Sequence, residues 1–186
     1  MSFDAVVLAG GDARRLGGVD KAAIEIGDVS LLDRALGAVG GAEQVIVVGP
    51  HRPASAAVQW TSETPAGGGP LRATGAGLQL VHSDVVAVLA VDYPFVTSGV
   101  VAALVRAAAS RDGAALEDAG GIMHYVVGAY QTNVLRAAID AQRGDDASMR
   151  GLFATLDVAA VRNERAALDI DTPEDLERAR TIAANV

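Results

Sequence analysis

A glycine-rich loop with cationic side chains follows the first apolar run of the chain. The run, Ala-Val-Val-Leu-Ala at positions 5–9, stops at Gly10 and Gly11. The densest local group of basic residues follows and consists of Arg14, Arg15 and Lys21. Glycine lets a backbone turn its N–H groups toward an anion, and Arg and Lys add the positive charge that a polyphosphate requires. Residues 8–21 therefore predict a phosphate-binding loop for a nucleoside triphosphate, with a solvated surface loop as the alternative.

The spelling of this loop disfavours two common nucleotide-binding motifs. A dinucleotide-binding loop has Gly-x-Gly-x-x-Gly running into a helix and an acidic residue about 20 positions later. Gly10-Gly11-Asp12 does not supply this pattern, which argues against a redox dinucleotide-binding protein. The loop also lacks the Gly-Lys-Ser/Thr ending of the P-loop NTPases.

Strands and helices alternate along the rest of the chain. Short apolar or β-branched runs that stop at glycine, proline or aspartate predict buried strands over residues 4–9, 45–48, 85–91, 113–116 and 126–130. Apolar residues at helical spacing predict helices over residues 30–39, 71–81, 98–109, 132–142 and 173–183. Residues 65–70 form a glycine-rich loop that is either a catalytic loop or a plain connector.

Two of the expected helices begin with cap signals. Ser98 is the expected N-cap of one, and Thr172 followed by Pro173 opens the last one. The alternation predicts a three-layer α/β/α fold with a mostly parallel, Rossmann-like sheet. Ligands of such sheets bind beyond the carboxyl ends of the strands. The phosphate loop and Asp92, which follows the strand at 85–91, should therefore share one edge of the sheet.

Length and charge narrow the class of protein. With 186 residues the chain is long enough for one full hydrophobic core, so we expect a single domain over residues 1–186. A formal net charge of −8 argues against a nucleic-acid partner. The lack of cysteine excludes disulfides and thiolate metal sites. The first residues have no basic leader region, and no apolar run approaches the ~20 residues of a membrane span, so we expect a cytoplasmic protein with no membrane contact.

Four motifs in order resemble one enzyme family. The first combines Leu-Ala-Gly-Gly at 8–11, Arg-Leu-Gly at 15–17 and Asp-Lys at 20–21, with one residue inserted before Asp20. The others are Gly-Pro-Leu at 69–71 with Gly75, Asp-Tyr-Pro-Phe at 92–95, and Asp-Thr-Pro-Glu-Asp-Leu at 171–176. Together they resemble the molybdenum cofactor guanylyltransferase family of nucleotidyltransferases, and the match extends over essentially the whole chain.

The resemblance implies a reaction and a set of partners. Members of the family join GMP from GTP to the terminal phosphate of molybdopterin, or of its molybdenum form, and release pyrophosphate. Arg15 and Lys21 would neutralise phosphate charge, and the backbone of Gly10 and Gly11 would hold phosphate oxygens. Transient contact with proteins that supply or accept the cofactor is also expected.

Magnesium is the cofactor that this reaction implies. A hard cation with carboxylate and phosphate ligands can bridge the phosphates, and Asp92 is the expected protein ligand. The alternative for Asp92 is a carboxylate that only ends its strand. Asp169 and Asp171 stand where the family usually has Asn-x-Asn. Both would approach the metal from the last strand, or Asp171 would cap the final helix.

The resemblance also indicates the nucleobase site. The backbone of Leu8, Ala9 and Gly10 would lie against guanine. Glu63 falls about where the family has an Asp near the nucleoside, and Gly49 where Asn is frequent. Related cytidylyltransferases have Ala-Ala-Gly at the first motif and often Asp-Ile-Asp-Thr-Pro near the end, which residues 169–173 match.

Several alternatives stay open. Cytidylyl transfer to the same pterin is the main enzymatic rival, and a non-catalytic relative that binds nucleotide or cofactor is the rival of another class. His124 and Tyr125 stand where the family often has His-Pro, and would either face the pterin or form a partly buried hydrogen-bonding pair. His51 and Arg52 would contact a ligand or lie in a solvated turn.

Overall fold

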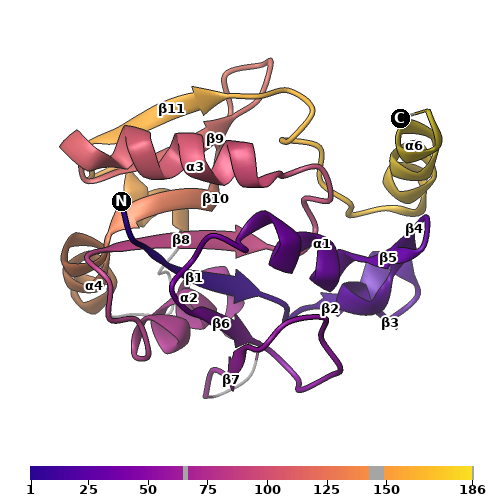
Figure 1. Ribbon diagram of the computed structural model, residues 1–186, viewed down its shortest axis with the longest axis horizontal. Helices are drawn as coiled ribbons and strands as arrows, with labels where there is room; N and C mark the ends of the chain where they lie inside the picture. Colours follow the sequence, from indigo (N-terminus) through magenta and orange to yellow (C-terminus); the bar gives the residue numbers. More distant parts are fainter. Residues whose placement is uncertain (65–66, 143–148, 186) are drawn as a thin grey trace.

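The computed structural model describes residues 1–64, 67–142 and 149–185, so residues 65 and 66 of the expected glycine-rich loop lie outside the described part. The main strands are β1 (Asp4–Leu8), β6 (Val45–Val48), β7 (Gln59–Thr61), β8 (Val85–Ala90), β9 (Gly113–Glu117), β10 (Met123–Gln131) and β11 (Val158–Arg162). They form one sheet in the order β11-β9-β10-β8-β1-β6-β7 (Figure 1). Strand β10 is antiparallel to both neighbours, and every other neighbouring pair is parallel. The prediction of a mostly parallel sheet is confirmed.

Helices cover both faces of this sheet. They are α1 (Leu31–Ala38), α2 (Gly69–Leu78), α3 (Ser98–Ala107), α4 (Thr132–Ala141), α5 (Met149–Phe153) and α6 (Pro173–Ala184). Alternate side chains of β1 point to opposite faces: Ala5 and Val7 pack with α1 and α3, whereas Val6 and Leu8 pack with α2, α4 and α5. Two apolar cores with the sheet between them give the expected three layers. No helix of the described residues is long and apolar enough to cross a membrane.

Short elements fill the region after β1. The pairs β2 (Asp12–Ala13) with β3 (Val19–Asp20) and β4 (Glu25–Ile26) with β5 (Val29–Ser30) form small antiparallel hairpins. Single 3-10 turns are η1 (Arg14–Leu16), η2 (Lys21–Ala23) and η3 (Ala108–Ser110). Helix α6, set at one side of the sheet, lies beside the β4–β5 hairpin (Figure 1). The last helix of the chain therefore lies near the segment that follows β1.

The structure corrects several details of the expected elements. Strands β7 and β11 were not expected, because β7 has only three residues and the alanines of β11 lack the β-branched pattern of a strand. The N-cap of α3 is Thr97 rather than Ser98, since the Thr97 hydroxyl accepts from the N–H of Val100. The cap predicted at Thr172 is confirmed, with Asp175 completing a capping box.

A buried carboxylate fixes the start of the sheet. Asp4 is only 2% exposed and accepts hydrogen bonds from the backbone N–H groups of His82 (2.7 Å) and Ser83 (3.0 Å) and from the Ser83 hydroxyl (2.8 Å). Burial raises the pKa of Asp4, but these hydrogen bonds outweigh burial and hold the pKa below its ordinary value of 3.8.

Replacing Asp4 with Ala should lower the free energy of unfolding by about 2–4 kcal/mol, because buried donors lose their acceptor. A carboxylate with a depressed pKa stabilises the fold above its unfolded pKa, and this stabilisation is lost as the pH falls through the folded value. Urea unfolding from pH 7 down to pH 3 should therefore show a parent–variant difference that is constant to about pH 4 and narrows below it. A difference that grows on acidification would contradict the assignment. Asp28→Ala, in the exposed β4–β5 turn, is the control.

Candidate active site

The loop after β1 is anchored to the ends of the two neighbouring strands. The N–H of Ala9 donates to the carbonyl of Val48 (2.9 Å), and the N–H of Val91 donates to the carbonyl of Leu8 (3.1 Å). The side chains of Leu8 and Ala9 are buried, whereas Gly10 and Gly11 are exposed. Because the side chains of Leu8 and Ala9 face the core, a ligand at this turn would meet backbone atoms.

Positive φ angles in this loop occur at glycines. Gly11 has φ of 135°, and Gly17 and Gly18 have φ of 81° and 75°, values that favour glycine. The β2–β3 pairing closes the loop and leads directly to Lys21. Arg15 lies on the exposed side of the loop, in the turn η1.

Lys21 connects three distant segments of the chain. Its Nζ donates to Asp92 Oδ2 at 3.1 Å and to Asp171 Oδ1 at 2.8 Å. Only 17% of the Lys21 side chain is exposed. Burial lowers the pKa of Lys21, but the two carboxylates outweigh burial and raise it above its ordinary value. The ammonium is therefore firmly charged, and the expected closeness of Lys21 and Asp92 at one sheet edge is met.

Asp92 is the most constrained carboxylate of this cluster. It follows β8, and its backbone carbonyl accepts from the N–H of Ile170 (3.0 Å). Its Oδ1 atom is buried and has no hydrogen-bond partner among the described residues. Burial raises the pKa of Asp92, and the Lys21 ammonium opposes that rise. An orphaned oxygen of this kind requires a further cation or donor.

Asp171 does not cap the final helix. The cap is Thr172, whose hydroxyl accepts from the N–H of Asp175, and the carboxylate of Asp171 instead bonds Lys21. The helix-cap alternative is therefore wrong. Asp169 and Asp171 come from the loop before α6 rather than from a strand. Burial, followed by the nearby charge of Asp171, raises the pKa of Asp169.

The residues expected beside the nucleoside have structural roles of their own. Gly49 has φ of 150°, and a Cβ atom there would lie 2.8 Å from the carbonyl carbon and oxygen of Ala9. Glu63 Oε1 accepts from the N–H groups of Gly67 (2.8 Å) and Gly68 (3.1 Å), just before α2. Their contact with a nucleotide stays a prediction.

Arg52 fastens the loop to the sheet, which the sequence did not reveal. Its guanidinium donates to both oxygens of Asp20 (2.9 and 3.0 Å) and to the carbonyl of Ala9 (3.1 Å). The expectation of a solvated turn is wrong for Arg52, while His51 is exposed and lies against the ring of Trp60. The available signal was a cation four residues after the end of β6.

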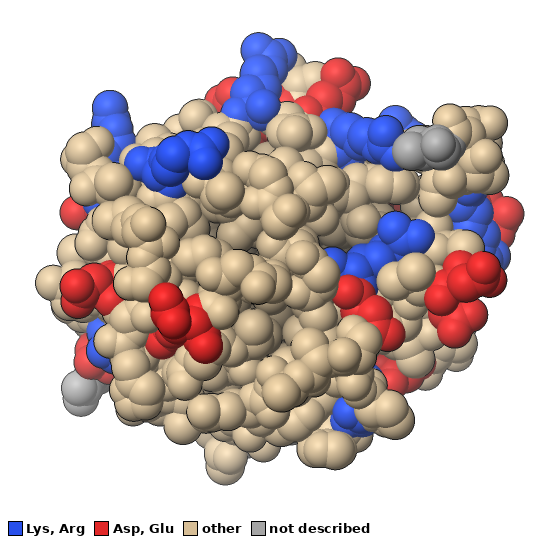
Figure 2. All heavy atoms as spheres, in the orientation of Figure 1, with Lys and Arg blue, Asp and Glu red and all other residues tan. Residues whose placement is uncertain are grey.

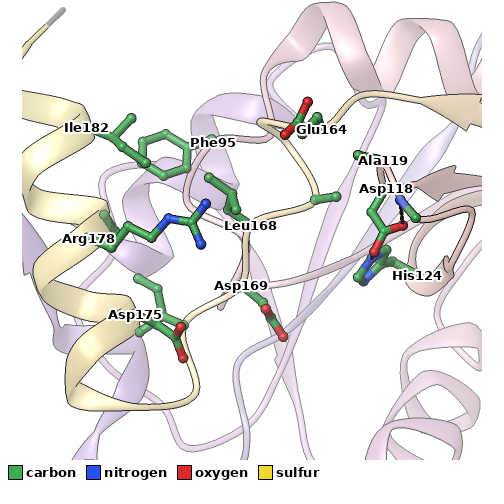
Figure 3. Close-up of a pocket in the computed structure, with 14 residues that line it drawn as sticks. Phe95, Asp118, Ala119, His124, Glu164, Leu168, Asp169, Asp175, Arg178 and Ile182 are labelled. Carbon is green, nitrogen blue, oxygen red and sulfur yellow. Dashed lines mark hydrogen bonds and ion pairs between the residues drawn. The ribbon is translucent and has the colours of Figure 1, made fainter.

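A cavity of about 300 Å³ lies beside the cluster (Figure 3). His124 lines it, and its Nδ1 is 3.0 Å from the hydroxyl of Tyr93. Tyr125 belongs elsewhere, because its ring stacks on Phe153 in the other core. His124 and Tyr125 therefore face different surroundings. Asp118 and Arg178, also on the cavity wall, were not predicted, since a hairpin carboxylate and a helical arginine resemble ordinary surface residues.

Charged residues of both signs are present on the face of the molecule in Figure 2. On the face shown in Figure 2, described Lys and Arg side chains are dispersed and form no continuous basic surface. The described residues contain no group of three or more His, Asp or Glu side chains that could hold a metal ion by themselves. Any metal at this edge would need ligands from a substrate or water as well as protein.

A three-layer, mostly parallel sheet whose first strand leads into a cationic glycine loop, with Asp92 at the end of a neighbouring strand, defines a nucleotidyltransferase domain. Residues 5–161 match the family model described as the MobA-like NTP transferase domain. The chain belongs to that family, and the resemblance drawn from its motifs is confirmed.

Curated relatives and solved structures agree with this assignment. A probable molybdenum cofactor guanylyltransferase of Mycobacterium ulcerans is 34% identical over 151 residues, covering 76% of this chain and 73% of the relative. Molybdopterin-guanine dinucleotide biosynthesis protein A of Archaeoglobus fulgidus superposes with a TM-score of 0.79 at 19% identity, covering 98% of this chain and 100% of the other. The 2-C-methyl-D-erythritol 4-phosphate cytidylyltransferase of Thermus thermophilus superposes with a TM-score of 0.79 at 23% sequence identity. The superposition covers 99% of this chain and 100% of the other. The two structures establish the fold.

Gly49→Asn introduces the residue that is frequent in the family and should lower the free energy of unfolding by about 2–4 kcal/mol, because its Cβ would collide with the turn at Ala9. Chemical denaturation measures the change. Gly37→Ala, inside α1 with nothing within 4 Å of the added carbon, is the matched control and should stabilise by about 0.5–1 kcal/mol. Equal effects of the two substitutions would refute the close-approach argument.

Proposed function

We propose that this protein transfers GMP from GTP to the terminal phosphate of molybdopterin, or of its molybdenum form, and releases pyrophosphate. The observation on which this rests is the cluster of Lys21, Asp92 and Asp171 beside the turn at residues 8–11. The curated relatives that match the chain at 33–34% identity are described as probable guanylyltransferases of the molybdenum cofactor, which supports the choice of nucleotide and acceptor.

The reaction needs positioning and charge neutralisation more than covalent chemistry. Two phosphate groups that repel each other must be aligned, and negative charge must be stabilised as pyrophosphate leaves. The backbone N–H groups of the exposed Gly10 and Gly11 and the side chain of Arg15 would hold the triphosphate. Lys21 would bind a phosphate once its ammonium turns away from the carboxylates. The acceptor phosphate is already ionised at neutral pH, so no general base is required.

The donor set at this edge fits Mg²⁺. The carboxylates of Asp92 and Asp171 both lie within hydrogen-bonding distance of one ammonium, so one cation can interact with both. Carboxylate, phosphate and water oxygens are the ligands that Mg²⁺ prefers, and Asp92 Oδ1 is free for this purpose. When bound, Mg²⁺ would withdraw charge from the phosphates. It would also compete with Lys21 for the same carboxylates.

The positions of the guanylyl-like motif at residues 8–11 and the cytidylyl-like motif at residues 169–173 favour guanine over cytosine as the base. The Leu-Ala-Gly-Gly spelling at 8–11 is at the turn expected beside the base. The cytidylyl-like spelling at 169–173 lies elsewhere, because Asp171 bonds Lys21 and Asp169 lines the neighbouring cavity. Cytidylyl transfer to the same acceptor is the second candidate, and that C-terminal spelling is the observation in its favour.

With Mg²⁺ present, GTP should raise the thermal midpoint more than CTP, ATP or UTP, because a ligand that binds only the native state stabilises it. Incubation with molybdopterin and each triphosphate in turn, followed by mass analysis, should give a guanine dinucleotide and free pyrophosphate. If CTP raises the thermal midpoint more than GTP does and yields the dinucleotide product, the proposed activity is cytidylyl transfer rather than guanylyl transfer. Binding of nucleotide with no product would support the non-catalytic alternative.

Lys21 and the metal should compete measurably. Lys21→Met should raise the affinity for Mn²⁺ without nucleotide by about tenfold or more, since it removes an ammonium from two carboxylates. Asp92→Asn should lower that affinity, and Arg111→Met, which removes a cation bound to the exposed Asp157 just before β11, should change it little. Mn²⁺ titration followed by electron paramagnetic resonance gives the affinities, with thermal midpoints recorded alongside. Weaker Mn²⁺ binding by a folded Lys21→Met protein would contradict the shared-carboxylate arrangement.

Lys21 is also the only lysine in the sequence. A protein labelled with ¹³C at the lysine ε carbon therefore gives one signal that reports Lys21 directly. Mg²⁺ with GTP should shift this signal, because the ammonium exchanges carboxylate partners for phosphate. A signal that stays unchanged at saturating Mg²⁺ and GTP would remove Lys21 from the phosphate site.

A further inference from the structure

The cavity beside Asp92 has walls from four separate parts of the chain. The β9–β10 hairpin contributes Asp118 and His124, the segment after β8 contributes Phe95, the segment after β11 contributes Glu164 and residues 167–170, and α6 contributes Asp175 and Arg178. Figure 3 shows Arg178 reaching from α6 toward Leu168, with His124 and Asp118 on the opposite wall. We call this cavity the acidic pocket. None of the lining residues belongs to the loop at 8–21.

One short segment separates the acidic pocket from the Lys21 cluster. Ile170 donates its N–H to the carbonyl of Asp92, and its neighbours point to different places: Asp169 lines the pocket and Asp171 bonds Lys21. On the hairpin side, Tyr93 follows Asp92 and bonds His124. A ligand in the pocket would therefore lie next to the catalytic carboxylates without using the phosphate loop. This is a suitable place for the second substrate.

His124 presents a buried nitrogen without a partner. Its Nε2 atom has no hydrogen bond among the described residues and is 3.5 Å from Asp118 Oδ2. When the Tyr93 hydroxyl donates to Nδ1, the proton of the neutral imidazole is on Nε2, which then offers an N–H. Asp118 uses its other oxygen to accept from the N–H groups of Gly120 and Ile122, which holds the hairpin in shape. A carbonyl oxygen of a ligand would satisfy the His124 N–H.

Asp169 offers the complementary acceptor. Its carboxylate interacts with the backbone N–H of Asp169 itself, and among the described residues no other group donates a hydrogen bond to it. Four carboxylates line the pocket against one guanidinium, namely Asp118, Glu164, Asp169 and Asp175 against Arg178. This balance repels a body that carries several negative charges and favours one with N–H donors. Apolar side chains on the wall, those of Phe95, Leu168 and Ile182, suit a flat ring.

We propose that the acidic pocket binds the ring end of the acceptor and that Asp169 and His124 select a neutral, flat heterocycle with two adjacent N–H donors and a carbonyl. An aminopyrimidinone ring, as in a pterin, has this pattern. Asp169 would accept from the ring N–H and the exocyclic amine, and His124 would donate to the carbonyl. The proposal rests on the proposed function for the nature of the acceptor, and it adds the residues that recognise it.

The probe is 6-hydroxymethylpterin, which is fluorescent and has no phosphate. It should bind the full-length protein in the presence of Mg²⁺ and GTP, and Asp169→Asn and His124→Phe should each weaken binding about tenfold or more. Glu43→Gln, at an exposed carboxylate two residues before β6, is the matched control and should leave the affinity unchanged. Glucose 1-phosphate, an anionic sugar, should not compete.

A second measurement separates acceptor recognition from damage to the nucleotide site. The thermal shift caused by Mg²⁺ and GTP should be the same for Asp169→Asn and the parent, and in turnover the variant should raise KM for the acceptor with little change in KM for GTP. A parent protein that binds no pterin, or an Asp169→Asn variant with parental pterin affinity, overturns the pocket assignment. A parent that binds pterin in the pocket and yet forms no guanine dinucleotide overturns the proposed function alone.

Discussion

The ammonium of Lys21, held between the carboxylates of Asp92 and Asp171, is the contact on which the rest of the site depends. It links Lys21 to Asp92, which is 71 positions later in the sequence, and to Asp171, which is 150 positions later. Without it, two carboxylates would face each other in a partly buried place, and like charges in such places are costly. An ammonium is a compact charge that two acceptors from different directions can share, whereas the planar fork of arginine is suited to paired oxygens of one group. The only lysine of the sequence thus lies where a compact cation is required.

The elements that bring these three side chains together are fixed by different interactions. Asp92 is placed by the parallel pairing of β8 with β1, and Lys21 by the hairpin that Arg52 ties to Ala9 and Asp20. Asp171 depends on the capping box that starts α6. A shallow apolar hollow on the molecule is lined by Leu16, Val19, Ile24, Pro173 and Leu176, among others. It lies between the phosphate loop and α6. A movement of the loop would therefore change the packing of the helix that positions Asp171.

Local patterns predicted the parts of the fold that local forces determine. The β-branched run at 45–48 is β6 to the residue, and the Thr-Pro start of α6 was read correctly, because strand burial and helix capping depend on adjacent residues. Strands β7 and β11 were missed, since tertiary pairing rather than propensity makes them strands. The helix-cap alternative for Asp171 and the solvated-turn expectation for Arg52 were wrong for a similar reason. Each side chain could cap or solvate locally, and its partner is far away in the sequence.

In the proposed reaction, the two neighbours of Ile170 serve different substrates. Asp171 belongs to the Lys21 cluster that would bind the nucleotide and its cation, and Asp169 lines the acidic pocket that would bind the acceptor. On one side, one ammonium and two carboxylates leave a formal charge of −1, and the further carboxylates around the acidic pocket make the region more negative. A free triphosphate would be repelled by this field, whereas a triphosphate that brings a divalent cation would be attracted. The proposed function accounts for the excess of carboxylates in this way, with Mg²⁺ and nucleotide entering as one complex. In the proposed arrangement the acceptor would meet the same field from the other side, and only its phosphate end would need to approach the cation, since the neutral ring would stay among the carboxylates.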